Sequence, residues 1–174
     1  SSLSEEKSNS YNYLLTNQIT KMNKMVVVEQ DFSMLEKTKL SYEILGKKIS
    51  SNEIVTLTKT NAQVSYDLKK MKLEVDSINK KLIIAELPNA EIKINPNVEI
   101  QSMDDSFINR IDENQIKKVT KSAKDAAIKR VDQNKLRNDG KIQLKENLNQ
   151  IFVLAKALNY EIVDKTGQID TTKL

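Results

Sequence analysis

Hydrophobic and polar residues alternate most regularly in the middle of the chain. Every second position there is apolar or aromatic, at Ala62, Val64, Tyr66 and Leu68. A period of two places these side chains on one face of a sheet, which predicts a half-buried antiparallel strand. Apolar and β-branched stretches at 25–28 and 40–45 predict two earlier strands in the same way.

Short strand-like runs continue to about residue 102, and residues that favour turns separate them. Asp76-Ser77-Ile78-Asn79 divides two of the runs. Leu87-Pro88-Asn89 and Asn95-Pro96-Asn97 are expected to end others, because proline has no backbone N–H for the strand ladder. The pattern therefore predicts a largely antiparallel sheet arranged as a meander.

The period becomes helical after about residue 106. Spacings near three and four join Ile108, Ile111, Ile116, Val119, Ala123, Ala126, Ala127 and Val131. A second apolar stripe predicts another helix, which begins near Asp139-Gly140 and ends near Asn159. The two helices are expected to form a pair that packs on the sheet, and residues 160–163 are a candidate final short strand.

These elements predict one α+β domain with polar ends. Residues 1–18 are expected to be a polar tether or a frayed helix, and residues 167–174 a polar tail. Between them, residues 19–166 are predicted to form a single domain, with strands at about 19–102 and helices at about 106–159. A chain of 174 residues is long enough to bury a core of that kind.

The composition excludes several classes of site. The chain contains no cysteine and no histidine. Disulfides, thiolate or imidazole metal sites, and Ser/His or Cys/His catalytic pairs are therefore excluded. Only three glycines are present, so glycine-rich nucleotide loops are excluded as well. We expect no cofactor, no metal and no catalytic residue.

Two groups of carboxylates have a structural and a chemical interpretation. Asp67 follows the alternating strand, where an aspartate usually accepts backbone N–H bonds in a turn. A second group, Asp104, Asp105, Asp112 and Glu113, precedes or begins the first predicted helix. This group could bind a hard cation or act in acid/base chemistry, but acidic residues at a helix start are also favoured by the helix dipole. We favour the turn and the capping roles.

Positive charge is concentrated in the helical region. Residues 115–146 contain ten lysines and arginines against four acids, a net charge of +6, whereas the whole chain carries +4. The candidate surface for an anionic partner consists of Lys117, Lys121, Lys124, Lys129 and Arg130. Such a surface could meet anionic lipid headgroups, an acidic protein or a nucleic-acid backbone, or it could be a solvated helix face. Nucleic acid ranks last, because aromatic residues and known binding motifs are absent from this region.

Three segments of the chain resemble a bacterial family catalogued as domain of unknown function 4230. The segments are Tyr66-Asp67-Leu68-Lys69-Lys70-Met71, the apolar run 82–92 with Leu87-Pro88-Asn89, and Arg137-Asn138-Asp139-Gly140. The resemblance covers roughly residues 19–163. It implies an extracytoplasmic domain that follows one N-terminal membrane segment, and it implies no catalytic or binding residue.

The leading expectation is therefore a membrane-tethered domain of the bacterial cell envelope that binds or scaffolds an unidentified envelope partner. The membrane segment would precede Ser1, since no stretch of the chain reaches the ~20 apolar residues that cross a bilayer. One alternative is a soluble enzyme that uses carboxylates and lysines alone. A third is polyanion binding through the basic helices. The sequence leaves the oligomeric state open.

Overall fold

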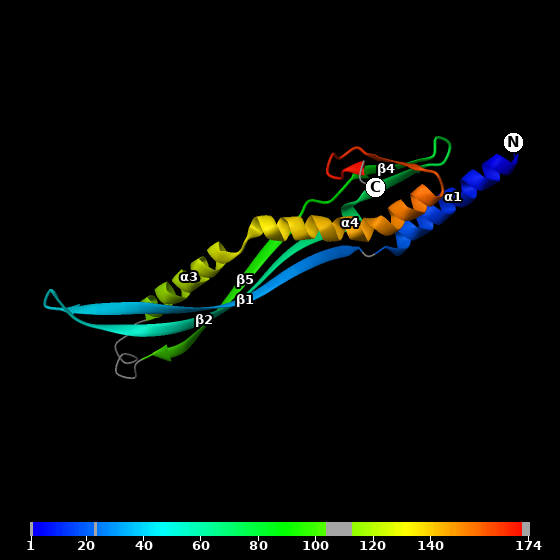
Figure 1. Ribbon diagram of the computed structural model, residues 1–174. Coiled ribbons are helices and arrows are strands. Elements are labelled where there is room, and N and C mark those ends of the chain that lie inside the picture. Colours follow the sequence, from blue (N-terminus) through cyan, green and yellow to red (C-terminus); the bar gives the residue numbers. More distant parts are fainter. Residues whose placement is uncertain (1, 23, 104–112, 172–174) are drawn as a thin grey trace. The chain divides into compact units, whose positions relative to one another are not determined.

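A computed structural model describes residues 2–22, 24–103 and 113–171, without the side chains of 41–44 and 48–52. The predicted α+β fold is confirmed, with strands, a C-terminal pair of helices and a last short strand (Figure 1). In chain order the elements are α1 (Ser2–Lys21), β1 (Met25–Ile44), β2 (Lys47–Asp67), the short 3-10 helix η1 (Leu68–Lys70), β3 (Lys72–Asp76), β4 (Lys81–Glu86), β5 (Glu91–Met103), α3 (Glu113–Arg130), α4 (Gln133–Ala157) and β6 (Glu161–Asp164).

The chain divides into two compact units, each built from separate stretches of sequence. Unit 1 consists of 1–28, 64–91 and 135–174, and unit 2 consists of 29–63 and 92–134. Strands β1, β2 and β5 and helix α4 each contribute residues to both units. The prediction that 19–166 folds as one domain stays a prediction.

Unit 1 is built on a three-stranded sheet in the order β3-β4-β6. Strands β3 and β4 are antiparallel, whereas β6 runs parallel to β4, with Leu82 opposite Ile162. A parallel pair needs a long connection, and here that connection contains β5, α3 and α4. The buried side chains of this unit include Leu15, Leu82, Ile84, Leu136, Leu144, Leu148, Ile151, Phe152, Ala155 and Ile162. Helix α4 thus buries the apolar stripe that its sequence predicts.

Local side-chain chemistry ends the elements of unit 1 where the sequence indicates turns. Between β3 and β4, the Asp76 carboxylate accepts hydrogen bonds from the Asn79 backbone N–H (3.0 Å) and side-chain amide (2.9 Å). Helix α4 ends before Asn159, which has a φ of 62°. The Tyr160 N–H then bonds to the Ala155 carbonyl oxygen (2.8 Å), as in a Schellman ending.

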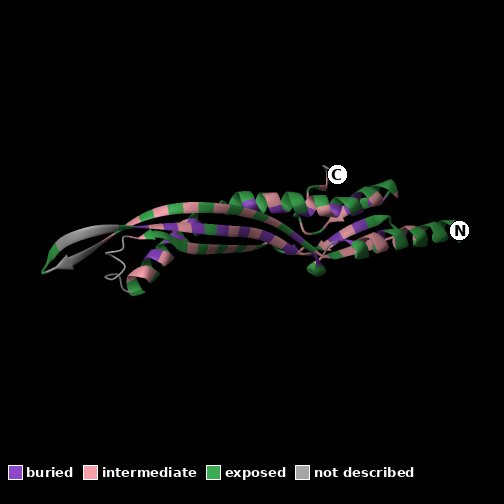
Figure 2. Cartoon of the chain, turned by 90° about the horizontal axis from the view of Figure 1, so that it is seen from below, coloured by how far each residue is buried: buried purple, intermediate pink, exposed green. Residues whose placement is uncertain are grey.

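Unit 2 is a three-stranded sheet in the order β1-β2-β5, with α3 packed on one face. Ile54 of β2 and Val119 of α3 form the buried contact, together with Leu40 and Met103. Figure 2 shows buried positions at alternate residues along the central strand, whereas the flanking strands alternate between exposed and half-buried positions. The buried face of β2 also carries three threonines whose hydroxyls have no hydrogen-bond partner, Thr56, Thr58 and Thr60.

Three element boundaries and the arrangement of the strands differ from the predictions. The N-terminal segment is helical to Lys21, so Ile19 belongs to α1 rather than to a strand, and Leu15 is fully buried. Pro96 does not end a run but lies inside β5, which an edge strand tolerates. Helix α4 begins at Gln133 and contains Gly140 in its interior. The strands also form two sheets, and only the hairpins follow a meander. Ile108 and Ile111 lie outside the described residues.

Candidate functional site

The predicted basic surface lies on α3 and is exposed. Lys117, Lys121, Lys124, Lys129 and Arg130 are all solvent-accessible. Lys117 pairs with Glu113 one turn earlier (Nζ to Oε1, 3.6 Å). Asp125 lies four residues from both Lys121 and Lys129, a spacing at which opposite charges attract on a helix. Acids of the same helix therefore partly compensate this surface.

Of the carboxylates named from the sequence, those that the structure describes lie in different parts of the fold. Asp67 caps η1 by accepting a hydrogen bond from the Lys69 backbone N–H (3.1 Å), which is the turn role predicted for it. Glu113 lies in the first turn of α3. Asp104, Asp105 and Asp112 lie outside the described residues. Within the described ranges, no group of three or more acidic side chains could hold a metal ion.

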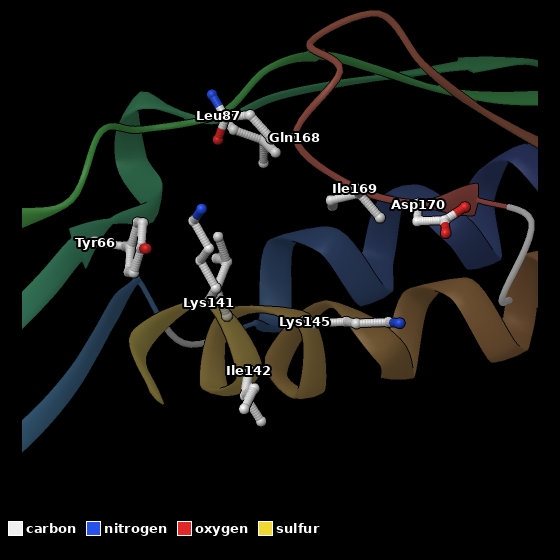
Figure 3. Close-up of a pocket in the computed structure, with 9 residues that line it drawn as sticks. Tyr66, Leu87, Lys141, Ile142, Lys145, Gln168, Ile169 and Asp170 are labelled. Atoms are coloured by element: carbon white, nitrogen blue, oxygen red, sulfur yellow. The ribbon is translucent and has the colours of Figure 1, made fainter. Parts of the chain in front are cut away.

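Unit 1 contains a hollow that the sequence did not predict. A cavity of about 180 Å³ is lined by Tyr66, Leu87, Lys141, Ile142, Leu144, Lys145, Gln168, Ile169 and Asp170. A neighbouring hollow of about 420 Å³ shares Tyr66, Lys141 and Gln168 with it and adds Arg137. We call these two hollows together the Tyr66 groove. In Figure 3, Lys141 points from α4 into the space between Tyr66 and Gln168, whereas Ile142 points away.

Three cations of α4 line this groove at intervals of one helical turn. Arg137, Lys141 and Lys145 are spaced four residues apart, which spreads them over about 12 Å along the helix. None of them has an acidic residue three or four positions away on α4. Like charges at this spacing destabilise a helix by about 0.2–0.5 kcal/mol per pair. The α4 triplet therefore lacks the acidic partners on its own helix that the lysines of α3 have, although Asp170 of the loop after β6 lines the same cavity.

Tyr66 forms the floor of the groove where it meets β2. Its side chain is 3% exposed. Burial raises the pKa of the Tyr66 phenol, and the positive charge of Arg137 partly opposes that increase. The phenol is therefore protonated at neutral pH and can donate a hydrogen bond to an anion in the groove.

The wall opposite α4 is the loop that follows β6, and Asp164 fixes its path. The Asp164 carboxylate accepts hydrogen bonds from the Thr166 N–H (2.9 Å), the Thr166 hydroxyl (2.6 Å) and the Ile169 N–H (2.8 Å). Burial raises the pKa of Asp164, but these hydrogen bonds outweigh it and hold the pKa below its ordinary value. Gly167, with a φ of 72°, provides the bend between the bonded residues.

The close approach of α4 to β2 depends on a glycine. A Cβ atom at Gly140 would lie 2.8 Å from Val64 Cγ1 and 3.2 Å from Tyr66 Cε2. Any side chain at this position would push the helix away from the strand. Gly140 therefore places Arg137 and Lys141, which lie on either side of it, beside Tyr66.

Comparison with known proteins places the chain in a family. The model of the family described as "Protein of unknown function (DUF4230)" matches residues 17–164. The chain belongs to this family. No curated protein and no solved structure gives a significant match. The three segments that carry the resemblance to the DUF4230 family converge on the Tyr66 groove, through Tyr66, Leu87 with Pro88, and Arg137 with Gly140.

Sequence reasoning missed this groove in the DUF4230 chain for a definite reason. The basic excess at 115–146 includes Arg137, Lys141 and Lys145, but the predicted surface lies on α3, where Lys117, Lys121 and Lys124 share one helical face. Two signals could have identified the groove residues. No acidic residue lies three or four positions from any of them on the helix, and Arg137 belongs to a segment that carries the family resemblance.

Proposed function

We propose that this chain is a binding domain and that the Tyr66 groove holds the anionic group of its ligand. The observation that carries the proposal is the α4 triplet, Arg137, Lys141 and Lys145, which lines a hollow and has no acidic residue three or four positions away on its own helix. The three positive charges outnumber Asp170, the one carboxylate among the residues that line the two hollows. An anion balances this excess, because a phosphate or carboxylate group accepts charge-assisted hydrogen bonds from guanidinium and ammonium groups.

The shape of the groove limits the kind of ligand. The inner cavity of about 180 Å³ has space for a small group, and Leu87 and Ile169 give it apolar walls. Tyr66 supplies a phenolic donor beside the cations. These features favour a small molecule with a phosphate or carboxylate end and a short apolar body.

An enzyme that uses carboxylates and lysines is the weaker proposal. General acid/base catalysis needs two titratable groups of different protonation state near one reacting atom. The residues that line the inner cavity include one carboxylate, Asp170, on the loop after β6. A binding role uses the cations and the phenol directly and requires no second carboxylate.

We further propose that the domain is extracytoplasmic and tethered to a membrane, with a binding or scaffolding role in the cell envelope. The support for this location is the resemblance to this family noted from the sequence, which implies a membrane segment before the domain. No helix among the described residues is long and apolar enough to span a bilayer. Membrane fractionation of the complete gene product, with protease added to intact cells, tests the location. A product that stays in the cytosol contradicts it.

Chemical-shift mapping locates the binding site without any substitution. Inorganic pyrophosphate is added to isotope-labelled protein, and backbone amide signals are followed by nuclear magnetic resonance. We expect saturable shifts at 137–145 and at 166–170, since these segments line the Tyr66 groove. Shifts confined to α3 would instead support polyanion binding by the predicted basic surface.

A further inference from the structure

The sheet of unit 2 has two edges that differ in how they are protected. The strand order β1-β2-β5 leaves β1 and β5 at the edges, and no strand among the described residues pairs with the outer side of either. Strand β5 carries Pro96, which removes a backbone donor and hinders the addition of another strand. Over residues 29–40, β1 contains neither proline nor glycine. The edge of β1 therefore offers an uninterrupted row of backbone donors and acceptors.

The exposed side chains along this edge have an ordered charge pattern. Odd-numbered residues of β1 are exposed from 29 to 39. In chain order they are Glu29, Asp31, Ser33, Leu35, Lys37 and Lys39. Two acids thus precede two lysines on the same face, and between them Leu35 is 67% exposed. Asn61 of β2 donates a hydrogen bond to the Asp31 carboxylate (2.9 Å), which holds this carboxylate on the exposed face.

We propose that β1 pairs antiparallel with β1 of a second copy of this chain, about a two-fold axis at Met34. In this register Glu29 of each copy lies opposite Lys39 of the other. Asp31 likewise lies opposite Lys37. Each of the two contacts occurs twice by symmetry, so acids face lysines on both sides of the central Ser33–Leu35 pairs. The two sheets then form one continuous sheet.

The register is specified by the sequence. A shift of the axis by one residue to Ser33 or Leu35 leaves only one acid–lysine contact per copy, Glu29 with Lys37 or Asp31 with Lys39. An axis between two residues would place exposed positions of one copy beside half-buried positions of the other, because the side-chain period is two. The Met34 axis is the register that satisfies both the charge pattern and the burial pattern.

Cysteine cross-linking tests the pairing directly, because the chain has no cysteine of its own. Met34→Cys places a thiol on the two-fold axis, where opposite Cα atoms lie about 4.5–5.5 Å apart, within reach of a disulfide. We expect mild oxidation to convert this variant into a covalent dimer. Gln30→Cys is the matched control, because residue 30 does not face itself in the second copy. Alone this variant forms no covalent dimer, but it cross-links when mixed with Thr38→Cys.

Charge reversal provides a second test that requires no covalent cross-link. Asp31→Lys places a lysine opposite Lys37 twice per dimer, and we expect the dissociation constant of the dimer, measured by analytical ultracentrifugation, to rise by about tenfold or more. The double variant Asp31→Lys/Lys37→Asp restores opposite charges and restores the dimer. Circular dichroism confirms that each variant is folded. A wild-type protein that stays monomeric, or a dimer that neither cross-links through residue 34 nor responds to Asp31→Lys, overturns the proposal.

Discussion

Gly140 of α4 lies directly against Val64 of β2, so closely that a Cβ atom would approach Val64 Cγ1 to 2.8 Å and Cγ2 to 3.3 Å. Because Val64 is fully buried and both of its methyl groups face the glycine, rotation of the valine cannot relieve the contact. Alanine would gain about 1 kcal/mol of helix propensity, but overpacking in a core costs about 1–3 kcal/mol. The cost of overpacking is therefore expected to equal or exceed the gain in helix propensity.

Gly140→Ala is expected to lower the free energy of unfolding by up to about 2 kcal/mol and to weaken anion binding, because α4 shifts away from Tyr66. Urea denaturation and titration with pyrophosphate measure the two effects. Gln143→Ala, at an exposed position of the same helix, provides the control for helix propensity. If Gly140→Ala proves more stable than the wild type, the close contact between α4 and β2 is wrong.

The lowered pKa of Asp164 implies that the stability of the fold depends on pH. Its folded-state pKa is lower than its unfolded value of about 3.9, so its contribution is fully present above that value. The contribution is lost as the pH falls through the lower folded-state pKa. Asp164→Asn keeps the size of the side chain but removes its charge, and we expect it to reduce the free energy of unfolding at pH 7 by about 1–2 kcal/mol.

Urea denaturation of the wild type and Asp164→Asn at pH 7 and at pH 3 checks this prediction. The difference between the two proteins is expected to narrow at the lower pH. Asp125→Asn, at an exposed position of α3, serves as the control for the removal of one carboxylate. A difference that stays constant between the two pH values would show that the Asp164 charge does not hold the loop.

We expect a substitution at Thr58 of β2 to stabilise the protein. Its side chain is 1% exposed and its hydroxyl has no hydrogen-bond partner. A buried hydroxyl without a partner is unfavourable, whereas valine has nearly the same shape and needs no partner. We expect Thr58→Val to raise the free energy of unfolding by about 1 kcal/mol. Thermal and urea denaturation measure it, with Thr38→Val at a half-buried position of β1 as the control. A loss of stability would mean that the hydroxyl has a partner in the folded protein.

The sequence predicted the elements of this fold well where one periodicity dominates. The alternation from Ala62 to Leu68 and the apolar stripe of α4 each specify one buried face, and the structure confirms both. The turn at 76–79 was also predicted, because aspartate and asparagine side chains bond to nearby backbone groups. In these cases local chemistry and tertiary packing favour the same structure.

Long-range contacts decided the features that the sequence did not predict. The second helix was predicted to begin near Gly140, because glycine is a poor helix former. In the structure Gly140 lies inside α4, where its close contact with Val64 leaves no space for a side chain. Pro96 was predicted to end a strand, but it lies inside β5. This strand is at a sheet edge, where a missing backbone N–H is tolerated. The Tyr66 groove combines β2, the segment after β4, α4 and the loop after β6, and no local pattern indicates that these four segments meet.

A comparison of two charge-matched triple variants tests the account most directly. Arg137→Gln/Lys141→Gln/Lys145→Gln and Lys117→Gln/Lys121→Gln/Lys124→Gln each remove three positive charges, one set from the Tyr66 groove and the other from α3. Pyrophosphate binding is measured by isothermal titration calorimetry at one salt concentration. We expect the α4 variant to lose at least about tenfold in affinity, since each charge-assisted contact contributes about 1.5–3 kcal/mol, and the α3 variant to bind like the wild type. Equal losses in both variants, or a loss confined to the α3 variant, would contradict the Tyr66 groove as the binding site.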